Sequence, residues 1–141
     1  MKTLKALLAA TFMALSICTF AGEDPNSQNL SMDYALKTYI NAFTSGKVKG
    51  FSEILDSDVK FTVARGQKIV SYSKSEMLNI MRNSENITQN CITDYSIVEQ
   101  SATQAIVKVN MKYDSFSKVN YVTMAQTKKG WKITNVSSEF V

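Results

Sequence analysis

The side chains of this sequence that could do acid–base chemistry are its carboxylates and tyrosines, because the chain of 141 residues contains no histidine. Histidine is the commonest general base near neutral pH and the commonest protein ligand for transition metals. Only two cysteines occur, Cys18 and Cys91, so the residue types of a zinc or non-haem iron site are also scarce. The sequence therefore predicts no metal site and no cofactor.

Strand periodicity places Glu139 on one face of the last predicted strand together with Trp131 and Asn135. If that face lines a pocket, Asn135 and Glu139 orient a ligand; if the strand end lies in solvent, Glu139 is a surface charge. Trp131, the only tryptophan, either closes the core or lines the ligand site. Asp56 and Asp58 precede a strand, in a turn, where short acidic residues are usually exposed. We assign no catalytic residue.

Tyr39 and Phe43 lie on the apolar face of a predicted helix. From Met32 onwards the apolar residues recur with the 3.6-residue period of an amphipathic helix. Ser31 is suited to begin this helix and Gly46 to end it. The Tyr39 hydroxyl could donate a hydrogen bond to a ligand, or Tyr39 could be a core residue with its hydroxyl at the rim.

Two further helices are predicted. A short one covers about residues 48–55, although Gly50 lowers its helical propensity. The other runs over about residues 74–83 and begins with a capping box formed by Ser73 and Glu76.

Phe61 belongs to the first predicted strand, in which Val59, Phe61 and Val63 alternate with polar or small residues. Arg65 and Gly66 then reverse the chain into a second strand, residues 68–72, which makes a hairpin. Four longer strands are predicted over about residues 92–99, 105–113, 119–128 and 131–140.

This order of elements predicts an α+β fold, because helices gathered on one face of an antiparallel sheet form that class. We expect three N-terminal helices packed on a strongly curved antiparallel sheet of about six strands. Such a sheet, twisted around the first helix, forms a cone whose open end is a natural ligand pocket.

The first 21 residues have the pattern of a secretory signal peptide: Lys2 and Lys5, then an apolar run, then small residues ending at Ala21. Ile17 stands before Cys18 where a lipoprotein signal has a small residue, so lipidation is not expected. We predict a signal peptide over 1–21, a flexible leader over 22–30 and one domain over 31–141. Cys91 is then the only cysteine of the mature chain, either buried or paired between molecules.

Charge gives little information about partners. Removing Lys2 and Lys5 with the signal peptide leaves 14 basic and 12 acidic residues, a net charge of +2. No basic run is longer than Lys128-Lys129, so nucleic acid is not predicted as a partner. After signal cleavage we expect no stable membrane insertion.

Two stretches carry a resemblance to a known family. The C-terminal sequence NYVTMAQTKKGWKITNVSSEF (120–140) and the helix start YSKSEMLNIM (72–81) resemble the putative lumazine-binding family, within the nuclear transport factor 2-like superfamily. The resemblance implies a cone-shaped α+β fold, and superfamily members often form homodimers through the sheet.

The same superfamily includes ketosteroid isomerase, scytalone dehydratase and SnoaL-like cyclases. The resemblance implies an aspartate base in the first strand for the isomerase, and Val63 occupies that place here. It implies a histidine for the dehydratase, and this chain has none. The fold is therefore expected without the acid–base groups of these enzymes.

We thus predict an exported, non-catalytic module, periplasmic or extracellular in a bacterium, that binds a small apolar or aromatic molecule or serves as an interaction domain. The alternative is a SnoaL-like or ketosteroid isomerase-like isomerase, dehydratase or cyclase that uses Tyr39 with a carboxylate, Glu139 or Asp94. The predicted pocket residues are Tyr39, Phe43, Phe61, Trp131, Asn135 and Glu139.

Overall fold

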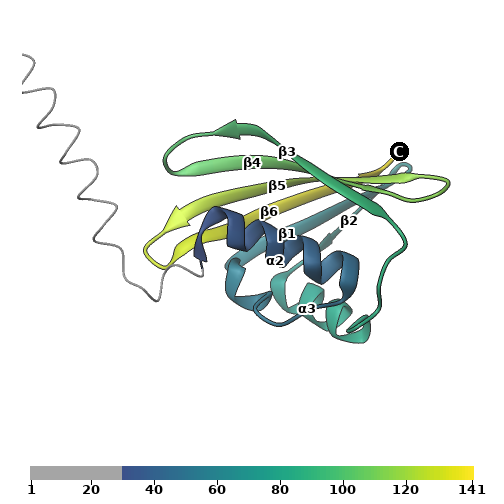
Figure 1. Cartoon of the computed structure of the whole chain (residues 1–141), viewed down its shortest axis with the longest axis horizontal. Helices are drawn as coiled ribbons and strands as arrows, with labels where there is room; N and C mark the ends of the chain where they lie inside the picture. The colour runs from purple at the N-terminus through teal and green to yellow at the C-terminus, as the bar shows by residue number, and fades with distance from the viewer. Residues whose placement is uncertain (1–29) are drawn as a thin grey trace, which may run out of the picture.

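The computed structural model describes residues 30–141, and the predicted signal peptide and most of the predicted leader lie outside that range. The described part forms two α-helices, a short 3₁₀ helix and a six-stranded sheet (Figure 1). Its elements are α2 (Met32–Ser45), η2 (Ser52–Ile54), β1 (Leu55–Arg65), β2 (Lys68–Tyr72), α3 (Lys74–Asn83), β3 (Ile92–Gln100), β4 (Gln104–Lys112), β5 (Ser117–Thr127) and β6 (Gly130–Phe140). None of the helices within residues 30–141 is long and apolar enough to cross a membrane.

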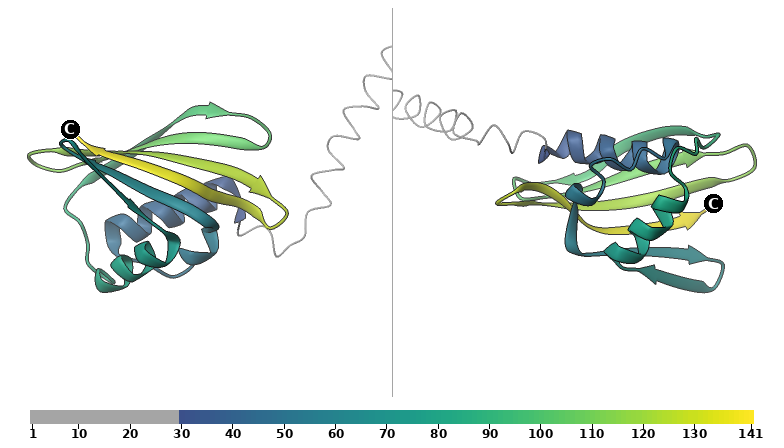
Figure 2. Two further views of the ribbon diagram at one scale, coloured as in Figure 1. Left: turned by 180° about the vertical axis from the view of Figure 1, so that it is seen from behind. Right: turned by 90° about the horizontal axis from the view of Figure 1, so that it is seen from below.

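The strands are ordered β2-β1-β6-β5-β4-β3 in one curved sheet. Both helices cover the same face, with α2 packed mainly on β6 and α3 on β1 (Figures 1 and 2). We call this helix-covered face the inner face and the opposite face the outer face. The α+β class and the six-stranded sheet agree with the prediction. The expectation of a purely antiparallel sheet was wrong, because β6 is inserted between β5 and β1 and runs parallel to β1.

The two predicted long helices are present, with the ends that the sequence indicates. Ser31 caps α2 by accepting a hydrogen bond from the Tyr34 amide, and Gly46 ends the helix in a left-handed conformation. Ser73 and Glu76 form the predicted capping box at the start of α3.

The third predicted helix is absent. Residues 52–54 form a single 3₁₀ turn, and the chain enters β1 directly at Leu55. Gly50 explains the difference, because its φ of 81° is incompatible with an α-helix at the start of the predicted segment.

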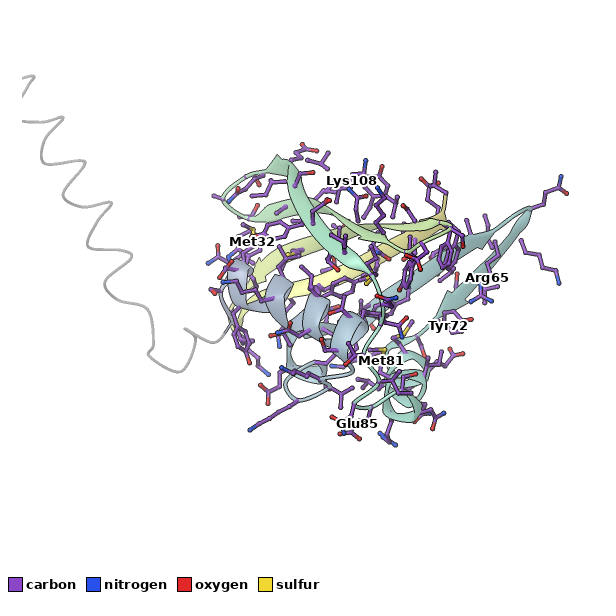
Figure 3. The ribbon with its side chains drawn as sticks, turned by 45° about the vertical axis from the view of Figure 1, so that its right-hand side comes forward. Met32, Arg65, Tyr72, Met81, Glu85 and Lys108 are labelled. Carbon is purple, nitrogen blue, oxygen red and sulfur yellow. The ribbon has the colours of Figure 1, made fainter. Side chains whose placement is uncertain are left out.

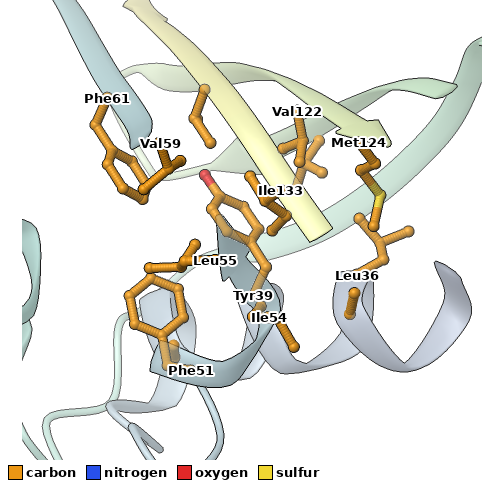
Figure 4. Close-up of a cluster of buried hydrophobic side chains, with 14 of the residues drawn as sticks. Leu36, Tyr39, Phe51, Ile54, Leu55, Val59, Phe61, Val122, Met124 and Ile133 are labelled. Carbon is orange, nitrogen blue, oxygen red and sulfur yellow. The ribbon is translucent and has the colours of Figure 1, made fainter. Parts of the chain in front are cut away.

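The core lies between α2 and the inner face of the sheet. Tyr39 and Leu36 of α2 pack there against Met124, Ile133 and other buried side chains from the sheet (Figure 4). The largest of these side chains are fully buried, which gives the sheet a single hydrophobic cluster to hold the helix.

Gly46 is also a packing constraint, because the chain after α3 runs across the end of α2. The Asn86 amide donates to the Gly46 carbonyl, and a Cβ atom at residue 46 would lie 2.5 Å from the Asn86 nitrogen. Gly66 has nearly the same φ, 61° against 65°, yet nothing lies within 4 Å of its Cβ position.

We therefore predict that Gly46→Ala destabilises the protein more than Gly66→Ala. Both substitutions place alanine in the left-handed region, at a cost of about 1–2 kcal/mol. Only Gly46→Ala adds a clash with backbone atoms, so its loss in free energy of unfolding should exceed that of Gly66→Ala by at least about 1 kcal/mol. Chemical denaturation measures both values, and equal losses would contradict the packing argument.

Candidate ligand-binding site

The inner face becomes more polar towards one end of the sheet. Residues paired across neighbouring strands point to the same face, so each pair forms part of a row across the sheet. Along β5 and β6 the successive inner rows are Val122 with Val136, Asn120 with Ser138, and Lys118 with Phe140. The last row lies where the β1–β2 turn, the β4–β5 turn and the C-terminus meet, which we call the hairpin end (Figure 1).

The middle row is a buried polar pair. Asn120 is fully buried and Ser138 is 7% exposed. The Ser138 hydroxyl donates to the Asn120 Oδ1 atom, and the Asn120 amide donates to the Val109 carbonyl at 3.2 Å. These bonds offset the cost of removing the groups from water, so the pair needs no external partner.

Tyr39 brings a polar group into the core from the helix side. Its ring is fully buried, and its hydroxyl is the one buried side-chain polar atom within residues 30–141 that lacks a hydrogen-bond partner. Figure 4 shows the ring rising from α2 towards the sheet among the apolar core side chains. Burial raises the pKa of this hydroxyl well above its usual range, so Tyr39 is a neutral hydrogen-bond donor.

Lys118 and Arg65 place two cations at the hairpin end. The Lys118 ammonium lies 5.1 Å from the centre of the Phe43 ring, and the Arg65 guanidinium lies 5.8 Å from that of Phe140. Burial, followed by the charge of Arg65, lowers the pKa of Lys118. The only ion pair within residues 30–141 joins Lys37 to Asp33, so no carboxylate of that part of the chain neutralises either cation.

A cleft of about 270 Å³ opens near this end, beside Cys91 and Tyr113. The Tyr113 ring stacks on Phe116 at 4.6 Å, and Phe116 in turn packs against Phe140. Burial, and after it the Cys91 thiol, raise the pKa of Tyr113. Cys91 itself is half-buried, and whether it pairs between molecules stays a prediction. The cleft is also lined by Asn90, Ile92, Lys112 and Asp114.

The structure brings together three of the predicted pocket residues. The Phe43 ring lies 4.7 Å from the ring of Tyr39 and 6.4 Å from that of Phe61. Trp131 is half-buried and packs against the core near the opposite end of the sheet from Lys118. The first three residues therefore lie beside the polar rows, and Trp131 does not.

Asn135 and Glu139 do not lie on the face that was expected. Met124 pairs with Ile133 but Thr123 pairs with Asn135, so Thr134 is an extra residue in β6. Such a β-bulge shifts the alternation by one residue and moves Asn135 and Glu139 to the outer face. Glu139 is exposed there, and the expectation that it shares a strand face with Trp131 was wrong.

Sequence reasoning missed Lys118, Asn120 and Ser138 as inner residues. The signal for the first two was present, because they alternate with Val122 and so continue the apolar face of β5. The signal for Ser138 was hidden by the bulge at Thr134.

Comparison with known proteins gives a consistent result for the fold. The family model described as putative lumazine-binding matches residues 29–137. No curated protein matches the chain. Solved structures of similar fold include a nuclear transport factor 2-like protein of unknown function from Silicibacter pomeroyi, with 12% identity, a TM-score of 0.67 and coverage of 84% of this chain and 100% of that one.

Two further solved structures carry different descriptions. One is a ketosteroid isomerase-like protein from Erwinia carotovora atroseptica, with 13% identity, a TM-score of 0.59 and coverage of 80% of this chain and 96% of that one. The other is a nuclear transport factor 2-like protein of unknown function in nutrient uptake from Rhodospirillum rubrum, with 16% identity, a TM-score of 0.61 and coverage of 79% and 98%. At these identities the likeness establishes the fold alone.

The buried polar pair yields a stability prediction. Ser138→Ala removes the donor to Asn120 and leaves a buried amide oxygen unpaired, which should cost about 1–3 kcal/mol of unfolding free energy. Ser137→Ala is the matched control, because Ser137 is exposed on the outer face and its loss should stay within about 0.5 kcal/mol. Equal effects in a denaturation series would show that the pair contributes nothing to the fold.

Proposed function

Because the chain belongs to the putative lumazine-binding family, with a nuclear transport factor 2-like fold, we propose that it is an exported, non-catalytic module that binds a small apolar or aromatic molecule. The description of the family points to small-ligand binding. We place the ligand at the hairpin end, because the core around Leu36, Met124 and Ile133 is filled by the protein's own side chains.

The unpaired Tyr39 hydroxyl is the observation that carries this proposal. Leaving a buried hydroxyl without a partner costs about 1–3 kcal/mol, a cost that phenylalanine at the same position would avoid. The cost is offset when a ligand supplies the hydrogen-bond acceptor. Phe43 and Phe61 beside Tyr39 are the apolar walls that such a ligand would contact.

The distribution of carboxylates favours binding over catalysis. An isomerase or dehydratase of this fold needs a general base near the pocket tyrosine. Within residues 30–141 every aspartate and glutamate is exposed except the half-buried Asp56. Asp94 accepts a hydrogen bond from Asn110 at the surface, and Glu139 lies on the outer face. Neither carboxylate named for the enzymatic alternative is thus placed to work with Tyr39.

Retention of a ligand tests the proposal. Native mass spectrometry of the protein purified from the exporting cell should show a bound small molecule that is lost on denaturation. Tyr39→Phe should lower the retained fraction, because one neutral hydrogen bond is worth up to about tenfold in affinity. Tyr121→Phe is the control, since Tyr121 lies exposed on the outer face.

A second test compares the unfolding free energies of the ligand-free wild type and ligand-free Tyr39→Phe. Without ligand, Tyr39→Phe should be more stable than the wild type by about 1 kcal/mol, because it no longer buries an unpaired hydroxyl. A wild-type protein that carries no ligand and has the same unfolding free energy as Tyr39→Phe would contradict the proposal.

Export rests on the signal pattern of residues 1–21, which lie outside the described residues. We expect bacteria that express the whole chain to yield a periplasmic or secreted protein that begins at Gly22, as measured by intact mass. Ala21→Asp should block cleavage, because signal peptidase requires a small residue there. Recovery of the wild-type chain at its full length would contradict the signal assignment.

The expected homodimer through the sheet stays a prediction.

A further inference from the structure

Lys118 is a half-buried cation on the helix-covered side of the sheet. Its position on β5 alternates with Asn120 and Val122, so its side chain enters the inner face rather than solvent. Its ammonium is placed against the ring of Phe43, on α2. A lysine that serves only solubility would occupy the outer face, as Lys108 does on the neighbouring strand (Figure 3).

The Phe43 ring, through a cation–π contact, and the negative end of the α2 dipole stabilise the charge of Lys118 in part, but no carboxylate of the described chain pairs with it. The charge of Arg65 acts on Lys118 repulsively. Both cations lie beside Phe140, which pairs with Lys118 in the sheet and whose ring centre lies 5.8 Å from the Arg65 guanidinium. Two cations near one ring, without an acidic side chain among the described residues to pair with them, are typical of an anion-binding site.

The aromatic rings beside the two cations indicate which class of anion would bind. The Phe43 and Phe140 rings lie against the cations, and Phe116 continues the apolar surface. These rings can contact an apolar or aromatic body, while the cations can bind a planar carboxylate, which arginine binds through two parallel hydrogen bonds. Phe43 lies in the last turn of α2, where the negative end of the helix dipole disfavours a doubly charged phosphate more than a singly charged carboxylate.

We propose that the hairpin end binds the carboxylate of an aromatic or apolar organic acid through Lys118 and Arg65, with the rings of Phe43 and Phe140 beside its body. This inference rests on the proposed binding function and names the chemical class of its ligand. Asn120 and Ser138 lie one row deeper on the inner face, Tyr39 faces the sheet from α2, and the carboxylate occupies the outermost row.

Isothermal titration with a matched pair of probes tests the proposal. The probes are 2-naphthoate and its neutral counterpart 2-naphthamide, which share the ring system and differ in charge. Wild-type protein should bind the naphthoate at least about tenfold more tightly than the amide, as expected for charge-assisted hydrogen bonds. Lys118→Met and Arg65→Gln should each remove about tenfold of the naphthoate affinity and leave the amide affinity unchanged.

Lys108→Met is the control variant. Lys108 is half-buried like Lys118 but belongs to the outer face of the adjacent strand, so its replacement should change neither affinity. The melting temperature of empty Lys118→Met should equal or exceed that of the wild type, because a poorly compensated charge is removed. If that variant fails to fold, Arg65→Gln decides the question alone, because Arg65 is exposed and its loss leaves the core intact.

The titration results distinguish failure of the carboxylate site from failure of the proposed small-molecule binding. If the amide binds as tightly as the naphthoate, or if neither cation variant weakens the naphthoate, the carboxylate site is overturned while small-molecule binding stands. If neither probe binds and the purified protein retains no ligand, both are overturned.

Discussion

The chemistry of the interior depends on one extra residue in β6. Side chains alternate between the two faces of a strand, so the residues that follow Ile133 on the inner face would be Asn135, Ser137 and Glu139 if the pairing were regular. The bulge at Thr134, whose hydroxyl donates to the Thr123 carbonyl, exchanges that set for Val136, Ser138 and Phe140. A regular strand would have brought a carboxylate inside the cone. The bulged strand brings in a hydroxyl instead, and the carboxylate stays in solvent.

Most of the fold could be predicted from local patterns, because helix periodicity, capping residues and strand alternation act over a few neighbouring residues. The capping box at Ser73 and the left-handed stop at Gly46 are examples, and both are present. The predicted helix at residues 48–55 depended on three apolar side chains, and the backbone of Gly50 was the stronger determinant. The parallel pairing of β1 with β6 joins segments about 75 residues apart, and no local pattern indicates it.

The site was less predictable than the fold, because part of it depends on strand pairing that local sequence patterns do not reveal. Tyr39, Phe43 and Phe61 were identified because each belongs to an apolar stripe that its own element reveals. Lys118 and Asn120 carry the same kind of signal on β5, but polar residues on an apolar stripe are easily taken for the end of a strand. Strand alternation assigned Glu139 to the inner face in place of Ser138, because a bulge has no sequence signature comparable to a cap or a turn.

The polar groups between α2 and the inner face of the sheet differ in whether the protein supplies their partners. Ser138 donates to Asn120, and the Asn120 side-chain amide donates to the Val109 carbonyl, so the burial of the pair is compensated within the chain. Tyr39 has no hydrogen-bond partner and Lys118 has no acidic partner among the described residues. A fold under selection for stability alone would replace Tyr39 by phenylalanine and Lys118 by an apolar residue, because each replacement removes a desolvation cost. That these uncompensated groups are kept close to a compensated pair favours a ligand, since a bound acid would supply the anion that Lys118 lacks.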